Sequence, residues 1–206
     1  MTESFCTPGQ TVGPFLDLGL SYPGDNLLVD GADPRAIRLH GTVYDGAGAA
    51  VPDALVELWQ PDGAGDVPRQ AGSLHRDHAV SIASAALGPG AAGRHHQAVF
   101  TGWGRCATGA AGDYSFTTLR PGSAIAGRPP FFALTVFARG LLNRLFTRAY
   151  LPGSEAHSDP LLAAVAPERR RTLICTAESD GVAYRFDIHL QGSAETVFLA
   201  YREDAR

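Results

Sequence analysis

The sequence predicts an all-β fold, a β-sandwich core with long loops and one short helix. Short segments with the composition of strands recur along the 206 residues, and dipeptides typical of tight turns lie between them. Turn-forming residues are abundant, with 24 glycines and 14 prolines. Since all-β domains often reach roughly 200–250 residues without dividing, we expect a single domain over residues 1–206. Within it we predict an N-terminal, partner-contacting arm over residues 1–36 and a sandwich core over residues 37–206.

The expected strands follow one another along the core, and most end at a turn signal such as Asp45-Gly46 or Pro121-Gly122. Segment 131–138 (FFALTVFA) is almost continuously apolar, which is typical of a strand covered on both faces. Segment 143–151 is its expected hairpin partner. We predict strands over residues 37–44, 54–59, 114–119, 131–138, 143–151, 172–177, 182–190 and 195–199.

The expected helix follows residue 158. Ser158-Asp159 supplies an N-cap, Pro160 fits the first turn, and residues 161–165 are mostly apolar. Pro167 and the charged residues 168–171 that follow it close or extend this helix. By contrast, residues 64–106 show little periodicity and are rich in Gly, Ala and Pro, which predicts a long loop. Loops of that length in compact domains tend to be functional or to cover a neighbour.

Composition excludes several classes of function. All 17 basic residues are arginines, set against 21 acidic residues, for a formal net charge of −4. A chain without lysine forms no Schiff base and is no P-loop NTPase, and mild acidity argues against nucleic-acid binding. The N-terminus lacks a signal-peptide pattern and no run of 18 apolar residues is present, so we expect no membrane span and a cytoplasmic protein. The charged fraction of 18% is low, which favours a surface partly covered by a partner.

The residues by themselves indicate no self-sufficient active site. His75-x-x-His78 and His95-His96 could in principle bind zinc or iron, but histidines in a loop without positioned neighbours are more often exposed to solvent. His189 alternates with Asp187, which is more typical of an outward polar face than of a ligand pair. Cysteine offers no clear nucleophile either. A neighbouring Arg105 could lower the pKa of the Cys106 thiol, but a buried, inert thiol is the commoner case.

Five blocks of sequence together carry a resemblance to a known family. They are TPGQTVGPF, GTVYDGAGAAVPDALVELWQPDGAGD, GDYSFTTLRPG, FFALTVFARG and AYRFDIHLQGSAETVFLAY. In this combination the chain resembles the intradiol ring-cleavage dioxygenases over nearly its whole length, and the loop from Arg69 to Gln97 is its least family-like part. The resemblance implies a β-sandwich core and an α/β hetero-oligomer with a homologous beta subunit.

The resemblance also implies where iron would bind, and these positions hold no iron ligand here. Catalytic members of the family hold a non-haem Fe(III) with two tyrosines and two histidines. The tyrosine positions correspond to Val67 and Ala124, and the histidines of the H-x-H strand correspond to Phe131 and Ala133. None of these side chains offers ferric iron a lone pair. The resemblance therefore implies that this chain is an iron-free subunit that is not catalytic by itself, and that Fe(III) is bound by the beta partner.

The implied reaction is the O2-dependent cleavage of an aromatic catechol-type substrate, and the chain is most similar to members that convert 3,4-dihydroxybenzoate to 3-carboxy-cis,cis-muconate in the β-ketoadipate pathway. The residues expected to face the substrate are Thr11, Gly13, Pro14 and Arg139. Without lysine, a cationic contact to the anionic substrate must come from arginine, and Arg139 is the expected one. A salt bridge at the end of the strand is its alternative role. Arg128, three residues before the first lost histidine, is expected to be structural.

Two alternatives remain open at the level of sequence. A non-enzymatic β-sandwich interaction or carrier module would have the same fold without substrate-facing residues. A metal centre in the loop with the four histidines would make the chain an independent metalloprotein.

Overall fold

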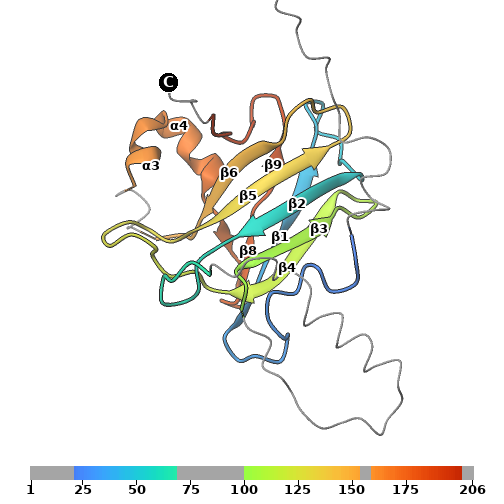
Figure 1. Ribbon diagram of the computed structural model, residues 1–206. Coiled ribbons are helices and arrows are strands. Elements are labelled where there is room, and N and C mark those ends of the chain that lie inside the picture. The colour runs from blue at the N-terminus through green and yellow to red at the C-terminus, as the bar shows by residue number, and fades with distance from the viewer. Residues whose placement is uncertain (1–20, 69–99, 154–158, 201–206) are drawn as a thin grey trace, which may run out of the picture.

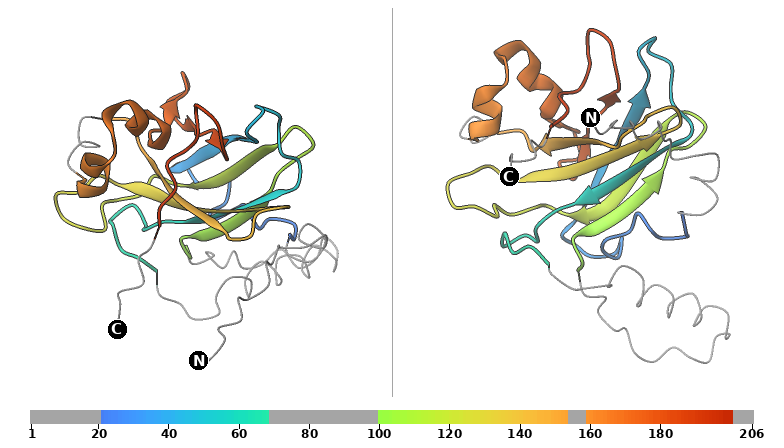
Figure 2. Two further views of the ribbon diagram at one scale, coloured as in Figure 1. Left: turned by 90° about the horizontal axis from the view of Figure 1, so that it is seen from above. Right: turned by 45° about the horizontal axis from the view of Figure 1, so that its top comes forward.

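The computed structural model describes residues 21–68, 100–153 and 159–200, and these residues form two β-sheets packed face to face (Figures 1 and 2). The all-β prediction is therefore confirmed. One hydrophobic core cluster joins the inner faces of both sheets, with Leu39 and Phe116 from one sheet and Val56, Phe132 and Leu134 from the other, all at most 1% exposed. Along the strands these core residues alternate with outward-facing residues, as the two-residue period of a strand requires.

The larger sheet has the order β4-β1-β8-β7, with β9 also paired to β1. Its longest strand, β1, pairs with β4 in antiparallel fashion and with β8 and β9 in parallel fashion. The bounds are β1 Ala36–Tyr44, β4 Asp113–Leu119, β7 Thr176–Ala177, β8 Ala183–Arg185 and β9 Ile188–His189.

The smaller sheet is antiparallel throughout, with the order β3-β2-β5-β6. Strands β2 and β5 have the predicted bounds, and β6 is the predicted hairpin partner of β5. The bounds are β2 Ala54–Trp59, β3 Trp103–Ala107, β5 Phe131–Ala138 and β6 Leu145–Tyr150.

Strand β3 corrects the prediction of an unbroken loop over residues 64–106. Its sequence, WGRCA, has no alternating pattern, and Gly104 lies in its interior. The glycine is required by close packing, because a Cβ at this position would lie 2.6 Å from Leu28 Cδ1 and 3.0 Å from the carbonyl oxygen of Asp25. The end of the N-terminal arm thus crosses directly over β3, and Arg105 N–H donates to the Asp25 carbonyl at 2.9 Å.

The strand predicted over residues 182–190 is divided into β8 and β9. At the break, the Phe186 carbonyl accepts a hydrogen bond from the buried Tyr114 hydroxyl at 2.6 Å. The chain passes β1 so closely there that a Cβ on Gly41 would overlap the Phe186 carbonyl. The Asp187 carboxylate then accepts a hydrogen bond from the backbone N–H of Thr42 at 3.0 Å. This side-chain contact takes the place of a backbone hydrogen bond between β1 and the segment that joins β8 to β9.

The expected helix is present, but the described residues contain a second one. Helix α3 (Pro160–Ala164) is capped by Asp159, as predicted, and α4 (Pro167–Arg170) continues into the 3₁₀ helix η2 (Arg171–Leu173). Pro167 therefore begins a new helix instead of extending the first. Both helices lie beside β6 (Figures 1 and 2), where Leu162 and Leu173 pack against Tyr150.

Two further strand predictions need correction at the C-terminal end. Within residues 172–177 the first two belong to η2, Ile174 forms an isolated bridge with Tyr150, and β7 is limited to two residues. Residues 195–199 form no strand and contribute an isolated bridge between Leu199 and Phe146. No helix among the described residues is long and apolar enough to cross a membrane.

Candidate functional site

Two of the four positions that the resemblance assigns to iron ligands lie at one pocket, next to the first residue of β5. These two, Ala124 and Phe131, line this pocket directly. Its described lining consists of Pro61, Gly122, Ser123, Ala124, Ile125, Arg128, Pro129, Pro130, Phe131, Arg148 and Asp159. We call it the ligand-position pocket. The sequence motifs locate Ala124, Arg128 and Phe131, but they do not locate Arg148.

The other two positions, Ala133 and Val67, are not among the described lining residues of this pocket. Ala133 lies two residues after Phe131, so both project from the same face of β5. In the antiparallel register Ala133 is opposite Trp59 of β2 and Arg148 of β6. Trp59 is 47% exposed and Val67 is 54% exposed, so this face of the sheet is partly open in the chain by itself.

Two loops are held together beneath the pocket by glycine packing. The turn after Pro61 docks on residues 122–124, where the Gly122 N–H donates to the Asp62 carbonyl at 2.7 Å. A Cβ on Gly122 would lie 2.5 Å from the Gly65 nitrogen, and a Cβ on Gly65 would overlap the Ser123 carbonyl. The Asp62 carboxylate stabilises the turn by accepting from the N–H groups of Ala64 and Asp66, each at 2.9 Å. This contact brings the Val67 and Ala124 positions toward each other.

The polar part of the pocket is organised around Arg148 of β6. Its guanidinium carbon lies 4.1 Å from the centre of the Phe131 ring, and its Nη1 donates to the Tyr150 hydroxyl at 3.2 Å. The same nitrogen lies 3.4 Å from Asp159 Oδ2, and the Asp159 side chain is only 1% exposed. Asp159 Oδ1 also accepts from the Leu161 N–H at 2.7 Å, so one buried carboxylate caps α3 and holds Arg148. Burial raises the pKa of Tyr150 to about 12, against the partly compensating Arg148 charge, so the phenol stays protonated at neutral pH.

The side chains at the four positions that the resemblance assigns to iron ligands do not fit ferric iron. Ferric iron prefers phenolate, imidazole and carboxylate ligands, and valine, alanine and phenylalanine supply none of these. Within residues 21–68, 100–153 and 159–200, no three His, Cys, Asp or Glu side chains are grouped so that they could hold a metal. His75, His78, His95 and His96 lie outside the described residues, so a metal centre in their loop stays a hypothesis.

Arg139 lies at the other end of β5, eight residues beyond Phe131. At about 3.3 Å per residue this separation is roughly 26 Å, so Arg139 is remote from the pocket of its own chain. Its Nη2 forms an ion pair with Asp53 Oδ2 at 2.8 Å, and its side chain is 70% exposed. The predicted role toward a substrate stays a prediction. The other predicted substrate-facing residues, Thr11, Gly13 and Pro14, lie outside the described residues.

The cysteines described by the structure are free thiols with raised pKa values. Burial raises the pKa of the Cys175 thiol to about 12 and raises that of Cys106 as well. Arg105 therefore does not activate Cys106, and the interpretation of an inert thiol is favoured.

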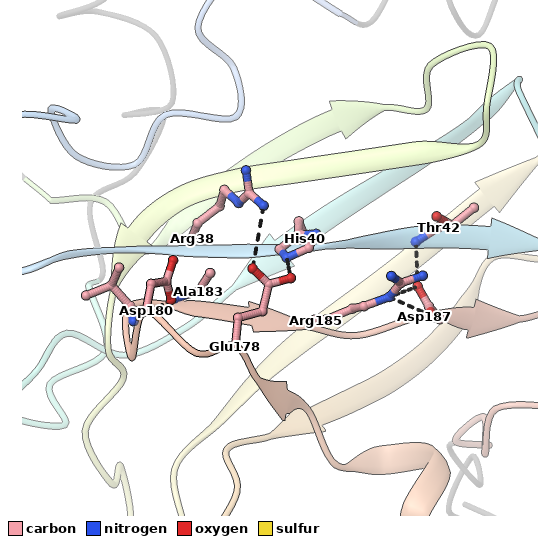
Figure 3. Close-up of polar contacts among 9 residues, drawn as sticks. Arg38, His40, Thr42, Glu178, Asp180, Ala183, Arg185 and Asp187 are labelled. Atoms are coloured by element: carbon pink, nitrogen blue, oxygen red, sulfur yellow. Dashed lines mark hydrogen bonds and ion pairs between the residues drawn. The ribbon is translucent and has the colours of Figure 1, made fainter.

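A polar network on the outer face of the larger sheet is structural (Figure 3). The Glu178 carboxylate lies between two residues of β1, 3.9 Å from Arg38 Nη2 and 2.9 Å from His40 Nε2. Asp187 accepts from Arg185 Nε at 2.9 Å, in addition to its bond from the Thr42 backbone. These contacts attach β8 and its flanking turns to β1. His189 stacks on Tyr44 with ring centres 4.9 Å apart, so the interpretation of Asp187 and His189 as an outward polar face is favoured.

Comparison with known proteins adds the family context. Residues 23–192 match the sequence family described as Dioxygenase. The chain is 35% identical to the protocatechuate 3,4-dioxygenase alpha chain of Burkholderia cepacia, covering 97% of this chain and 99% of that protein. It is 35% identical to the alpha chain of Pseudomonas putida, with 95% and 96% coverage. The beta chain of Burkholderia cepacia is 33% identical, over 87% of this chain and 76% of that protein.

Solved structures support the fold. The dioxygenase domain of a dioxygenase carbohydrate-binding protein fusion from Streptomyces sp. SirexAA-E superposes with a TM-score of 0.53 at 22% identity, covering 91% of this chain and 99% of that one. The intradiol ring-cleavage dioxygenase from Tetranychus urticae gives a TM-score of 0.52 at 17% identity, with 82% and 88% coverage.

Proposed function

Since this chain belongs to the dioxygenase family, we propose that it is the alpha subunit of a protocatechuate 3,4-dioxygenase, an iron-free oxidoreductase subunit that acts with a homologous beta subunit. Two alpha chains match at 35% identity over nearly their whole length, whereas the beta chain match covers 76% of that protein. The location that we propose for the complex is the cytoplasm.

One observation carries the iron-free assignment: the family's ligand positions hold Val67, Ala124, Phe131 and Ala133, and Arg148 lies over the Phe131 ring. A cation already occupies the space beside this position, and a second, trivalent cation there would be repelled by it. Iron would therefore be bound by the beta subunit.

The proposed reaction opens the ring of 3,4-dihydroxybenzoate between its two hydroxylated carbons. The bond between these carbons breaks, and each of them gains one atom of O2 and becomes a carboxyl carbon. The product, 3-carboxy-cis,cis-muconate, is therefore the substrate plus both atoms of O2, with no other reactant consumed. Ferric iron on the partner would supply the activation of the catecholate. This chain would contribute a wall of the partner's pocket through Thr11, Gly13, Pro14 and Arg139, and a surface for assembly.

The geometry of Arg139 is compatible with a cationic contact to an anionic substrate. An exposed ion pair such as Arg139–Asp53 contributes only about 0–1 kcal/mol, so exchanging Asp53 for a substrate anion costs little. The same ion pair also supports the alternative of a carrier or interaction module, in which Arg139 only stabilises the end of its strand. An experiment on the assembled complex separates these two functions.

The complex is reconstituted from this chain and a homologous beta chain that retains two tyrosines and the H-x-H strand, and O2 consumption is measured with 3,4-dihydroxybenzoate. We expect Arg139→Ala to lower kcat/KM by about tenfold to a hundredfold, since one charge-assisted contact is worth about 1.5–3 kcal/mol. Arg169→Ala, which removes an exposed arginine paired with Glu195 and lies outside the predicted partner-contacting arm, is the matched control and should leave kcat/KM unchanged. An intact complex with undiminished kcat/KM in Arg139→Ala would support the carrier module instead.

A further inference from the structure

We propose that the ligand-position pocket of this chain binds a small aromatic carboxylate without converting it. The pocket has lost the residues for iron chemistry, but it keeps a concave apolar wall with cationic groups at its edge. This is the general composition of a small-molecule site, in which apolar surface supplies binding energy and a few polar groups fix the orientation. The proposal goes beyond the function in catalysis, since it concerns a site that works with neither iron nor the partner.

The charges of the pocket favour an anion. Its lining contains two arginines, Arg128 and Arg148, and one carboxylate, Asp159. The carboxylate is held by Arg148 and the Leu161 N–H, so one positive charge remains uncompensated within the lining. Arg128 is exposed, and its guanidinium forms no hydrogen bond or ion pair with any residue that the structure describes. A bound monoanion would therefore neutralise the single excess positive charge of the pocket lining.

Arg148 still has donors to offer to a ligand. Both of its described hydrogen bonds leave from Nη1, toward Tyr150 and Asp159, so Nε and Nη2 have no hydrogen-bond partner within the described part of the chain. The guanidinium is fixed by these bonds and by the Phe131 ring, and its side chain is 26% exposed. A planar donor group with a fixed orientation is suited to the two oxygens of a carboxylate.

The apolar walls select a flat ring over a simple anion. Pro61, Pro129 and Pro130 contribute rigid surfaces, and Ala124, Ile125 and the Phe131 ring complete the wall. The side chain of Ile125 is 52% exposed, and a ring bound beside it would remove apolar surface from water. The cavity of the pocket is small, about 70 Å³, which is well below the roughly 300–1,000 Å³ of typical ligand sites, so it holds at most one ring that stays partly open to solvent.

The test is a titration of the full-length chain with benzoate, measured by isothermal titration calorimetry. Benzamide has the same shape without the charge, and acetate has the charge without the ring. We expect benzoate to bind at least tenfold more tightly than either compound. Arg128→Gln removes one cation without breaking any described contact, and it should weaken benzoate binding about threefold to tenfold. Arg35→Gln is the control and should have no effect.

A second variant removes the fixed donor. Arg148→Met should abolish benzoate binding, and the double variant Arg148→Met/Asp159→Asn avoids leaving a buried carboxylate without its partner. If the chain alone does not stay folded, the same titration is carried out on the complex with the beta chain. There the proposal predicts two benzoate sites per pair of chains, of which only one is weakened in Arg128→Gln and only one is lost in Arg148→Met/Asp159→Asn.

Equal affinity for benzoate and benzamide, or benzoate affinity unchanged in both Arg128→Gln and the double variant, would overturn the proposal. These outcomes are independent of the proposed function, which is judged by the turnover of the complex with 3,4-dihydroxybenzoate. A complex that turns over normally but shows one benzoate site per pair would refute the second site alone.

Discussion

The Tyr150 hydroxyl accepts a hydrogen bond from Arg148 at 3.2 Å while its side chain is fully buried. Burial raises its pKa from about 10 in solvent to about 12. A phenol with a raised pKa in the folded state stabilises the protein fully below pH 10, and this contribution is lost as the pH rises through about 12.

We therefore expect the free energy of unfolding, measured with denaturant, to fall from pH 10 to pH 12. Tyr150→Phe should make this fall shallower. It should not abolish the fall, because the pKa of the Cys175 thiol is also raised to about 12 and Cys175 is retained. The role given to Tyr150 would be wrong if the variant showed the same pH dependence as the unchanged protein.

At the scale of single residues, the sequence predicts which residues have a special role better than it predicts which residues they contact. The family motifs located Phe131, and the helix signal located Asp159 as an N-cap, which the structure confirms. The second partner of Asp159 is Arg148, which lies on β6 outside the helix, and no local pattern predicts that contact. Burial of the carboxylate depends on tertiary packing, so the pairing required the three-dimensional structure.

At the scale of elements, the docking of two loops determines the pocket. Gly122 packs against the turn of Gly63 and Gly65 so closely that any side chain must displace backbone atoms. We expect Gly122→Ala to lower the free energy of unfolding by about 1–3 kcal/mol, as overpacking does in protein cores. Gly63→Ala, in the same turn, is the matched control, because its Cβ would lie 3.7 Å from the nearest heavy atom, in ordinary contact.

Thermal and denaturant unfolding of both variants decide this prediction. A Gly122→Ala protein as stable as Gly63→Ala would show that the contact between the two loops is not tight in solution.

The strands show which elements a sequence can reveal. β2 and β5 were predicted with correct bounds, since their apolar character is strong and uninterrupted by glycine. β3 was missed because Gly104 and Arg105 break its pattern, and the reason for Gly104 is the arm that crosses it. The break between β8 and β9 was also missed, because it depends on the hydroxyl of Tyr114, a residue of another strand.

At the scale of the whole molecule, the described residues form the two-sheet β-sandwich found in solved dioxygenases, and we propose that the side chains that would bind iron are replaced. The core of the chain joins the two sheets in the described residues, and its relatives include both alpha and beta chains. The interior of the sandwich is apolar and contains no group that needs a metal among the described residues, so under our proposal an iron-free chain keeps its fold for assembly with a homologous chain. The central claim is that this chain binds no iron and that the complex depends on its partner for it.

The most direct test is the iron content of the full-length chain purified alone, and of its complex with a homologous beta chain that retains the four ligands. We predict a colourless chain without stoichiometric iron, and one ferric ion per pair of chains in the complex, with the absorption band of tyrosinate bound to iron. If iron without that band were found in the chain alone and were lost when His75, His78, His95 and His96 are changed to alanine, the metal centre would lie in the histidine loop instead. Stoichiometric iron with the tyrosinate band in the chain alone would contradict the central claim.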